Sequence, residues 1–96
     1  MTDKIVPLEV KRELAAPPDV EAHGGTEILR LFVSGGALSL SMQRGFDTPE
    51  TWGRLLADLA RHVAGVYERE TPIDAETALA AIGAAFDAAL NPEAMN

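Results

Sequence analysis

Asp58 and His62 come closest in this sequence to a pair of residues that does chemistry. They stand four positions apart in a segment with helical periodicity, so they share one flank of the expected helix. A carboxylate one turn before a histidine orients the imidazole and raises its basicity, as in a general base or a metal's outer shell. The alternative is a structural histidine, solvated or partly buried. The lack of an HExxH pattern favours that alternative.

A second candidate group, Arg44, Asp47 and Trp52, falls at the junction between an expected strand and an expected helix. In the functional interpretation these residues form the wall of a small-molecule or peptide pocket. In the structural interpretation Asp47 and Thr48 cap the following helix, and Trp52 is its first large core residue. We prefer the structural interpretation, because helix capping already requires these residue types here.

The remaining polar residues give weaker signals. Ser39 and Ser41 have no G-x-S-x-G context around them, so a serine hydrolase is not indicated. The glycine pairs at 24–25 and 35–36 are too short to cradle a phosphate, and the acidic residues are dispersed. The sequence therefore predicts no catalytic residue, no metal and no cofactor. It leaves an enzyme open while favouring a protein that is not one.

Composition narrows the class of protein. The chain has 96 residues, eight basic against fifteen acidic, and a net charge of −7. That length is typical of one domain. Nucleic acids and anionic membranes both select basic surfaces, so neither partner is expected. The chain has no cysteine, and its N-terminus shows no apolar signal segment. We therefore expect a cytoplasmic protein.

The candidate residues are carried by three expected elements of secondary structure. The first is a β-hairpin, whose strands are expected at 27–33 and 37–44. If Gly35 and Gly36 form a two-residue turn, both glycines adopt positive φ at little cost. This register puts three apolar pairs on one side, which we call the apolar face: Leu29 with Met42, Leu31 with Leu40, and Val33 with Leu38. It also puts Glu27 opposite Arg44. The other side, the mixed face, carries Ile28, Arg30, Phe32, Ser39, Ser41 and Gln43.

Two helices are expected after the hairpin, at 49–68 and 75–90. Thr48 with Pro49 starts the first helix, and Asp74 starts the second. Pro72 ends the first helix by excluding helical geometry at the preceding residue. Small residues recur along both helices. They indicate either a tight seam between the helices or only the high helix propensity of alanine.

The predicted fold class is α+β: the antiparallel hairpin packed against two antiparallel helices. Residues 1–25 are expected to form an extended arm. The alternation at 5–10 makes this segment a candidate third, edge strand, and Pro17-Pro18 is expected to stop any helix. The expected ββαα core spans 26–91, followed by a loose tail at 92–96.

Four segments of this chain carry a recognisable pattern: Glu27 to Arg30, Gly36 to Ser41, Phe46 to Gly53 and Leu56 to Ala64. In these segments the chain resembles a family of small bacterial proteins classed only as a domain of unknown function. The Phe-Asp-x-Pro-x-x-Trp-Gly stretch is the most specific. The likeness runs from about residue 5 to Leu90 and implies a compact bacterial domain. It supplies no activity, ligand or catalytic residue. In that family a larger, β-branched residue often stands where Ala57 does here.

A lone hairpin is marginally stable and leaves two strand edges unpaired. Two helices cover only one of its faces, so the mixed face also needs a cover. We therefore expect a non-enzymatic homodimeric interaction or accessory module that associates through the hairpin edge or the mixed face. The alternative is a small-molecule-binding protein or minor enzyme with a pocket at the hairpin–helix junction. The candidate contact residues are Arg30, Phe32, Arg44, Asp47, Trp52, Asp58 and His62.

Overall fold

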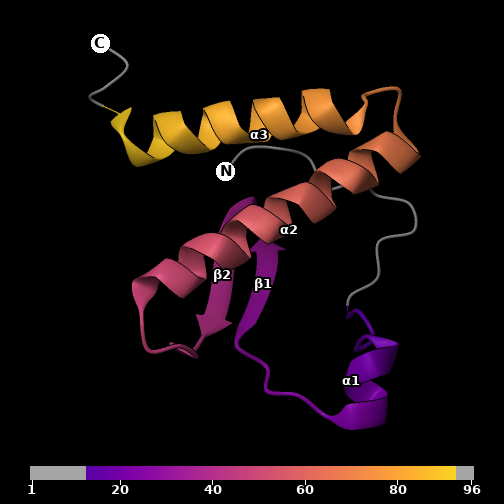
Figure 1. Cartoon of the computed structure of the whole chain (residues 1–96), viewed down its shortest axis with the longest axis vertical. Coiled ribbons are helices and arrows are strands. Elements are labelled where there is room, and N and C mark those ends of the chain that lie inside the picture. The colour runs from indigo at the N-terminus through magenta and orange to yellow at the C-terminus, as the bar shows by residue number, and fades with distance from the viewer. Residues whose placement is uncertain (1–12, 93–96) are drawn as a thin grey trace. The chain divides into compact units, whose positions relative to one another are not determined.

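A computed structural model describes residues 13–92 of the chain. The chain divides between Gly45 and Phe46 into two compact units. The first unit holds a short helix and a hairpin, and the second holds two long helices (Figure 1). Their elements are α1 (Pro18–His23), β1 (Leu29–Ser34), β2 (Ala37–Met42), α2 (Pro49–Glu70) and α3 (Ala75–Leu90). The predicted α+β class is confirmed.

Helix α1 corrects the expectation that Pro17-Pro18 stops any helix. Pro17 is the N-cap and Pro18 stands in the first turn. Proline is favoured at this position, because its missing N–H would have no helical acceptor and its φ is already helical. The Pro17 carbonyl accepts hydrogen bonds from the N–H groups of Val20 and Glu21, at 3.0 and 3.1 Å. The two prolines therefore start a helix of six residues instead of preventing one.

The hairpin has the predicted register. Leu29 lies opposite Met42, Leu31 opposite Leu40, and Val33 opposite Leu38. Gly35 and Gly36 have φ of 58° and 80°, the positive values that a type I′ turn requires. The alternation of apolar and polar residues therefore fixed the pairing, because a shift of one residue would exchange the two faces.

Both strands are shorter than predicted at the end remote from the turn. The residue pairing ends at Leu29 and Met42, and one further bond runs from the Gln43 N–H to the Ile28 carbonyl at 3.0 Å. The expected opposition of Glu27 and Arg44 thus falls beyond the ladder. Glu27 instead places its Oε2 3.0 Å from Nε of Arg30, three residues further along the chain.

Helix α2 begins where the sequence predicted and ends two residues later. Thr48 is the N-cap and Pro49 the first helical residue. The Thr48 hydroxyl lies 3.3 Å from the Thr51 hydroxyl and makes no capping bond to the backbone. At the other end Thr71 is extended, with φ −140° and ψ 169°. That conformation is the one a following proline imposes.

Helix α3 has the predicted N-cap. The Asp74 carboxylate accepts a hydrogen bond from the Thr77 N–H at 2.7 Å. This backbone bond, together with one from the Thr77 side chain, lowers the pKa of the Asp74 carboxyl, because both bonds favour its charged form. The bond gives an acceptor to one of the N–H groups that a helix start leaves unpaired.

α2 and α3 pack against each other as an antiparallel pair, joined by residues 71–74. Within residues 13–92 the buried apolar residues are Ala64 on α2 and Ala78 on α3, 1% and 6% exposed. Both belong to the small residues that recur along the two helices, at positions 53, 57, 60 and 64 of α2 and 78, 81, 85 and 88 of α3, and both lie toward the helix connection. Of the others, Gly53, Ala57, Ala81 and Ala85 are exposed, and Ala60 and Ala88 are half-buried. The small residues of the seam are therefore fully buried only toward the connected ends of the helices.

Several predictions lie outside these observations. The candidate strand at 5–10 falls outside the described residues, as does the tail apart from Pro92. The packing of the helices on one face of the hairpin relates the two units and stays a prediction. In the part of the chain that is described, the sheet has two strands.

Candidate functional site

Arg30, on the mixed face, makes three side-chain contacts. Its guanidinium lies 3.0 Å from Glu27 Oε2 and 3.5 Å from Glu13 Oε2. Its Cζ atom also lies 5.7 Å from the centre of the Phe32 ring, within the range of a cation–π contact. Arg30 is therefore already engaged by two carboxylates and a ring, which reduces its availability to an anionic ligand.

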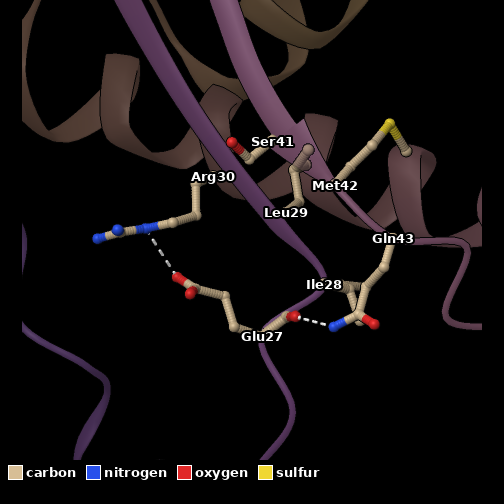
Figure 2. Close-up of a pocket in the computed structure, with 7 residues that line it drawn as sticks. All are labelled: Glu27, Ile28, Leu29, Arg30, Ser41, Met42 and Gln43. Atoms are coloured by element: carbon tan, nitrogen blue, oxygen red, sulfur yellow. Dashed lines mark hydrogen bonds and ion pairs between the residues drawn. The ribbon is translucent and has the colours of Figure 1, made fainter.

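A shallow depression of about 210 Å³ lies beside this arginine, at the open end of the hairpin (Figure 2). It is smaller than the range of roughly 300–1,000 Å³ usual for small-molecule sites. Its polar groups bind one another: the Gln43 side-chain amide donates to the Glu27 carbonyl at 2.7 Å. The lining residues are Glu27, Ile28, Leu29, Arg30, Ser41, Met42 and Gln43.

The predicted junction pocket draws on both units. Arg44 belongs to the first unit, while Asp47 and Trp52 belong to the second, so this pocket stays a prediction. Within the second unit the Trp52 ring meets the Phe46 ring edge to face, with centroids 5.7 Å apart and planes at 72°. Such aromatic pairs are worth about 0.5–1.5 kcal/mol beyond the area they bury. This ring contact supports the structural interpretation of Trp52 as a packing residue at the start of α2.

The described contact between Asp58 and His62 runs through the backbone. His62 Nδ1 lies 3.1 Å from the backbone carbonyl oxygen of Asp58. A carbonyl only accepts, so Nδ1 donates in this bond. The acceptor is therefore a backbone group and not the carboxylate that the sequence interpretation invoked. A helix carbonyl points toward the residue four positions later, which brings it within hydrogen-bond distance of this ring.

The hairpin exposes apolar side chains on both faces. On the mixed face Phe32 is 45% exposed, and on the apolar face Leu40 is 46% and Met42 55% exposed. Leu31, Val33 and Leu38 are also exposed. Exposure thus does not single out the mixed face as the contact surface. An exposed apolar strand surface is typical of a place where another polypeptide binds.

The backbone of the apolar-face residues points toward the sheet edges. In an antiparallel pair, hydrogen-bonded and non-hydrogen-bonded residue pairs alternate. Ile28 and Gln43 are hydrogen-bonded, so the next pair in the register, Leu29 with Met42, is not. By the same alternation the N–H and C=O groups of Leu38, Leu40 and Met42 point away from β1. Among residues 13–92 no other strand pairs with the β2 edge, so within the described part of the chain these groups can bind another strand.

Residues 13–92 contain neither a metal-binding cluster nor a membrane-spanning helix. No group of three or more His, Asp or Glu side chains is arranged there to hold a metal ion. None of the described helices is both long and apolar enough to cross a bilayer.

These features define an α+β domain whose main candidate site is an exposed hairpin. The chain belongs to the family described as a domain of unknown function, DUF5076, whose model matches residues 13–93. This confirms the resemblance found in the sequence. No curated protein matches the chain.

One solved structure similar to this chain comes from the photosynthetic bacterium Rhodopseudomonas palustrus CGA009. It is described as a "putative pyruvate dehydrogenase". The two proteins are 42% identical with a TM-score of 0.68, and the match covers 88% of this chain and 99% of that one. The two chains are therefore close in size and share a fold.

Sequence reasoning missed two contacts that shape the open end of the hairpin and the start of α2. The Gln43 side chain reaches the Glu27 carbonyl, and Phe46 packs on Trp52. The first pair is sixteen residues apart, and only the register of the hairpin brings it together. The second pair flanks the cap of α2, so its six-residue spacing was a signal that could have been used.

Proposed function

We propose that this protein is a non-enzymatic interaction or accessory module that works as a homodimer through its hairpin. The observation that carries the proposal is the exposed, uncharged β2 edge, whose Leu38, Leu40 and Met42 present backbone and apolar groups together. Such an edge binds another strand readily. A dimer would pair it and would also enlarge a two-stranded sheet that is marginal alone.

Charge supports the hairpin as the contact region. The chain carries a net charge of −7, so two copies repel each other at most surfaces. Residues 28–44 include Arg30 and Arg44 and no acidic residue. Contact through this segment therefore avoids placing carboxylates against carboxylates.

A bacterial, cytoplasmic setting is part of the same proposal. A similar structure comes from a bacterium, and the chain has no cysteine, as is common where thiols stay reduced. The non-enzymatic role is favoured by the mutual engagement of Arg30, Glu27 and Gln43, because these polar groups bind one another in the depression.

Sedimentation equilibrium tests the dimer. From about one to several hundred micromolar protein, the average mass should rise from one chain to two chains, with a Kd in the micromolar range typical of small interfaces. A strict monomer at high micromolar concentration would contradict the proposal. Raising the salt concentration should strengthen association, since it screens the repulsion between two acidic chains.

A second candidate is a small-molecule-binding protein or minor enzyme. It is favoured by the name of the structure from Rhodopseudomonas, which points to pyruvate chemistry. In this alternative Arg30, Arg44, Asp47 or His62 would act in a pocket at the hairpin–helix junction, with an arginine binding the substrate carboxylate.

Alanine variants separate the two candidates. In the binding or enzyme alternative, pyruvate raises the melting temperature, and Arg44→Ala or His62→Ala removes that shift while the fold persists. In the module proposal these variants change only stability or association. A thermal-shift titration with pyruvate, with acetate as the matched anion, makes the comparison.

A further inference from the structure

We propose that β2 pairs with β2 of a second copy, antiparallel about Leu40, so that two hairpins form one four-stranded sheet. The inference rests on the homodimer proposed above and names its interface. The argument starts from strand β2, Ala37–Met42, and from the direction in which its backbone groups point.

The first step is the hydrogen-bonding capacity of the β2 edge. By the alternation established above, Leu38, Leu40 and Met42 direct their N–H and C=O groups away from β1. In an antiparallel pairing centred on Leu40, Leu40 meets Leu40 of the second copy. Leu38 then meets Met42. The three residue pairs are Leu40 with Leu40, and Leu38 with Met42 in both directions. In each pair the backbone groups of the two residues face each other, which is the condition for a continuous ladder of hydrogen bonds.

The second step is the symmetry of the side chains. The segment Leu38-Ser-Leu-Ser-Met42 reads nearly the same in both directions. An antiparallel pairing about its centre therefore puts apolar beside apolar and Ser39 beside Ser41. Cross-strand partners share a face, so the apolar faces of the two hairpins join into one surface. A two-fold interface needs this kind of self-complementarity, which is why a second copy fits better than an unrelated strand.

The third step is that β2 lacks the usual protection of an edge strand. Natural edges are guarded by charged residues, by proline or by bulges. β2 has no charged residue and no proline, and its pairing with β1 is regular from Ala37 to Met42. β1 differs, because its second residue is the charged Arg30, to which Glu27 and Glu13 are bound. The structure therefore assigns association to the β2 edge.

The register is also selective. A shift of one residue would bring each leucine opposite a serine and would turn the backbone groups out of alignment. A shift of two residues would keep the faces but would shorten the ladder. The pairing centred on Leu40 uses all three residues of β2 whose backbone groups point outward, Leu38, Leu40 and Met42.

Charge pairs at the serine positions test the arrangement. In the variant Ser39→Glu with Ser41→Glu, each new carboxylate lies opposite another across the interface, so Kd should rise about tenfold or more. In Ser39→Lys with Ser41→Glu, each lysine lies opposite a glutamate, so Kd should stay within about threefold of the parent protein or fall. Ser41 lies opposite Arg30 in the same hairpin. Both variants carry the Ser41→Glu change, so any effect on Arg30 is common to them and cancels in the comparison.

A control separates this local effect from net charge. Ala80→Glu with Ala84→Glu adds the same two charges on exposed positions of α3. It should weaken association less than the double glutamate on β2. Circular dichroism of each variant verifies that the fold is retained.

Amide hydrogen exchange gives a second readout that needs no substitution. The N–H of Leu40 should exchange slowly at concentrations where the dimer forms and at least about tenfold faster in the dilute monomer. The N–H groups of Ser39 and Ser41 point toward β1, so they serve as internal references at both concentrations.

The outcomes separate the two proposals. A protein that never dimerises overturns the homodimer and this inference together. A dimer with a fast-exchanging Leu40 amide, or one indifferent to the charge pairs, overturns only the β2 pairing and leaves the homodimer standing. A Leu40 amide that is equally slow in the monomer also overturns the inference, because the edge is then covered within one chain.

Discussion

The carboxylate of Glu68 accepts a hydrogen bond from the backbone N–H of Ala75 at 3.0 Å. Glu68 lies in the last turns of α2, and Ala75 is the first residue of α3. The first N–H groups of a helix have no acceptor within it, and a negative charge is favourable there. α2 therefore supplies one cap for α3, and Asp74 supplies another. The turn between the helices is fixed by this pair of acidic residues.

Replacing Glu68 by alanine should destabilise the helix pair by about 1 kcal/mol, the usual loss when a helix N-terminal cap is removed. Glu70→Ala is the matched control, because it removes the same charge from the same end of α2. Urea denaturation of both variants measures the difference. Equal stability of the two would mean that the Glu68–Ala75 bond contributes nothing.

The hairpin and the long helices were predictable because their signals are local. Gly35-Gly36 required one turn type, and the alternation of leucine with serine then left one register. Thr48-Pro49 and Asp74 marked the helix starts, and Pro72 excluded helical geometry at Thr71. In each case a few neighbouring residues determine the backbone, so no knowledge of distant contacts was needed.

The missed features depend on context beyond the nearest residues. Pro18 suits either a helix start or a loop, and the choice in favour of α1 was not visible in the pattern. The cap from Glu68 requires that α2 turn back on α3. Arg30 has several carboxylates within reach in sequence, and the strand geometry determines that Glu27 and Glu13 bind it. Side-chain partners across a turn were therefore beyond sequence reasoning.

Acid should weaken the start of α3. The pKa of Asp74 is lowered in the folded protein by its bonds from Thr77, relative to about 3.9 in an unfolded chain. Above the unfolded value its stabilising contribution is fully present, and it is lost as the pH falls through the folded pKa. Asp74→Asn keeps a capping oxygen but cannot titrate, so its stability should change less between pH 5 and pH 2. Denaturation curves at both pH values, with Asp87→Asn as control, measure this.

A larger side chain at Ala64, in the seam between the helices, should lower the stability of the helix pair. This residue is 1% exposed, so Ala64→Leu must displace its neighbours and should cost about 1–3 kcal/mol. Ala57→Leu, two turns earlier in the same row and exposed, should change stability by less than about 0.5 kcal/mol. Thermal or urea denaturation of the two variants compares them. A similar effect at both positions would contradict a seam that is closest toward the connected ends of the helices.

Two glycine-to-alanine changes should have opposite signs. Gly35 has φ of 58°, and a Cβ added there meets nothing within 4 Å. Backbone strain alone should therefore destabilise Gly35→Ala, by about 1 kcal/mol. Gly53 lies inside α2, where a Cβ also meets nothing within 4 Å, so Gly53→Ala should stabilise by about 0.5–1 kcal/mol. Amide exchange in β2 reports the first change, and urea denaturation of the helices reports the second.

Gly35→Asn is the control for the turn, because asparagine tolerates positive φ and should restore most of the loss. Faster β2 exchange in the asparagine variant than in the alanine variant would contradict a type I′ turn as the element that holds the hairpin register.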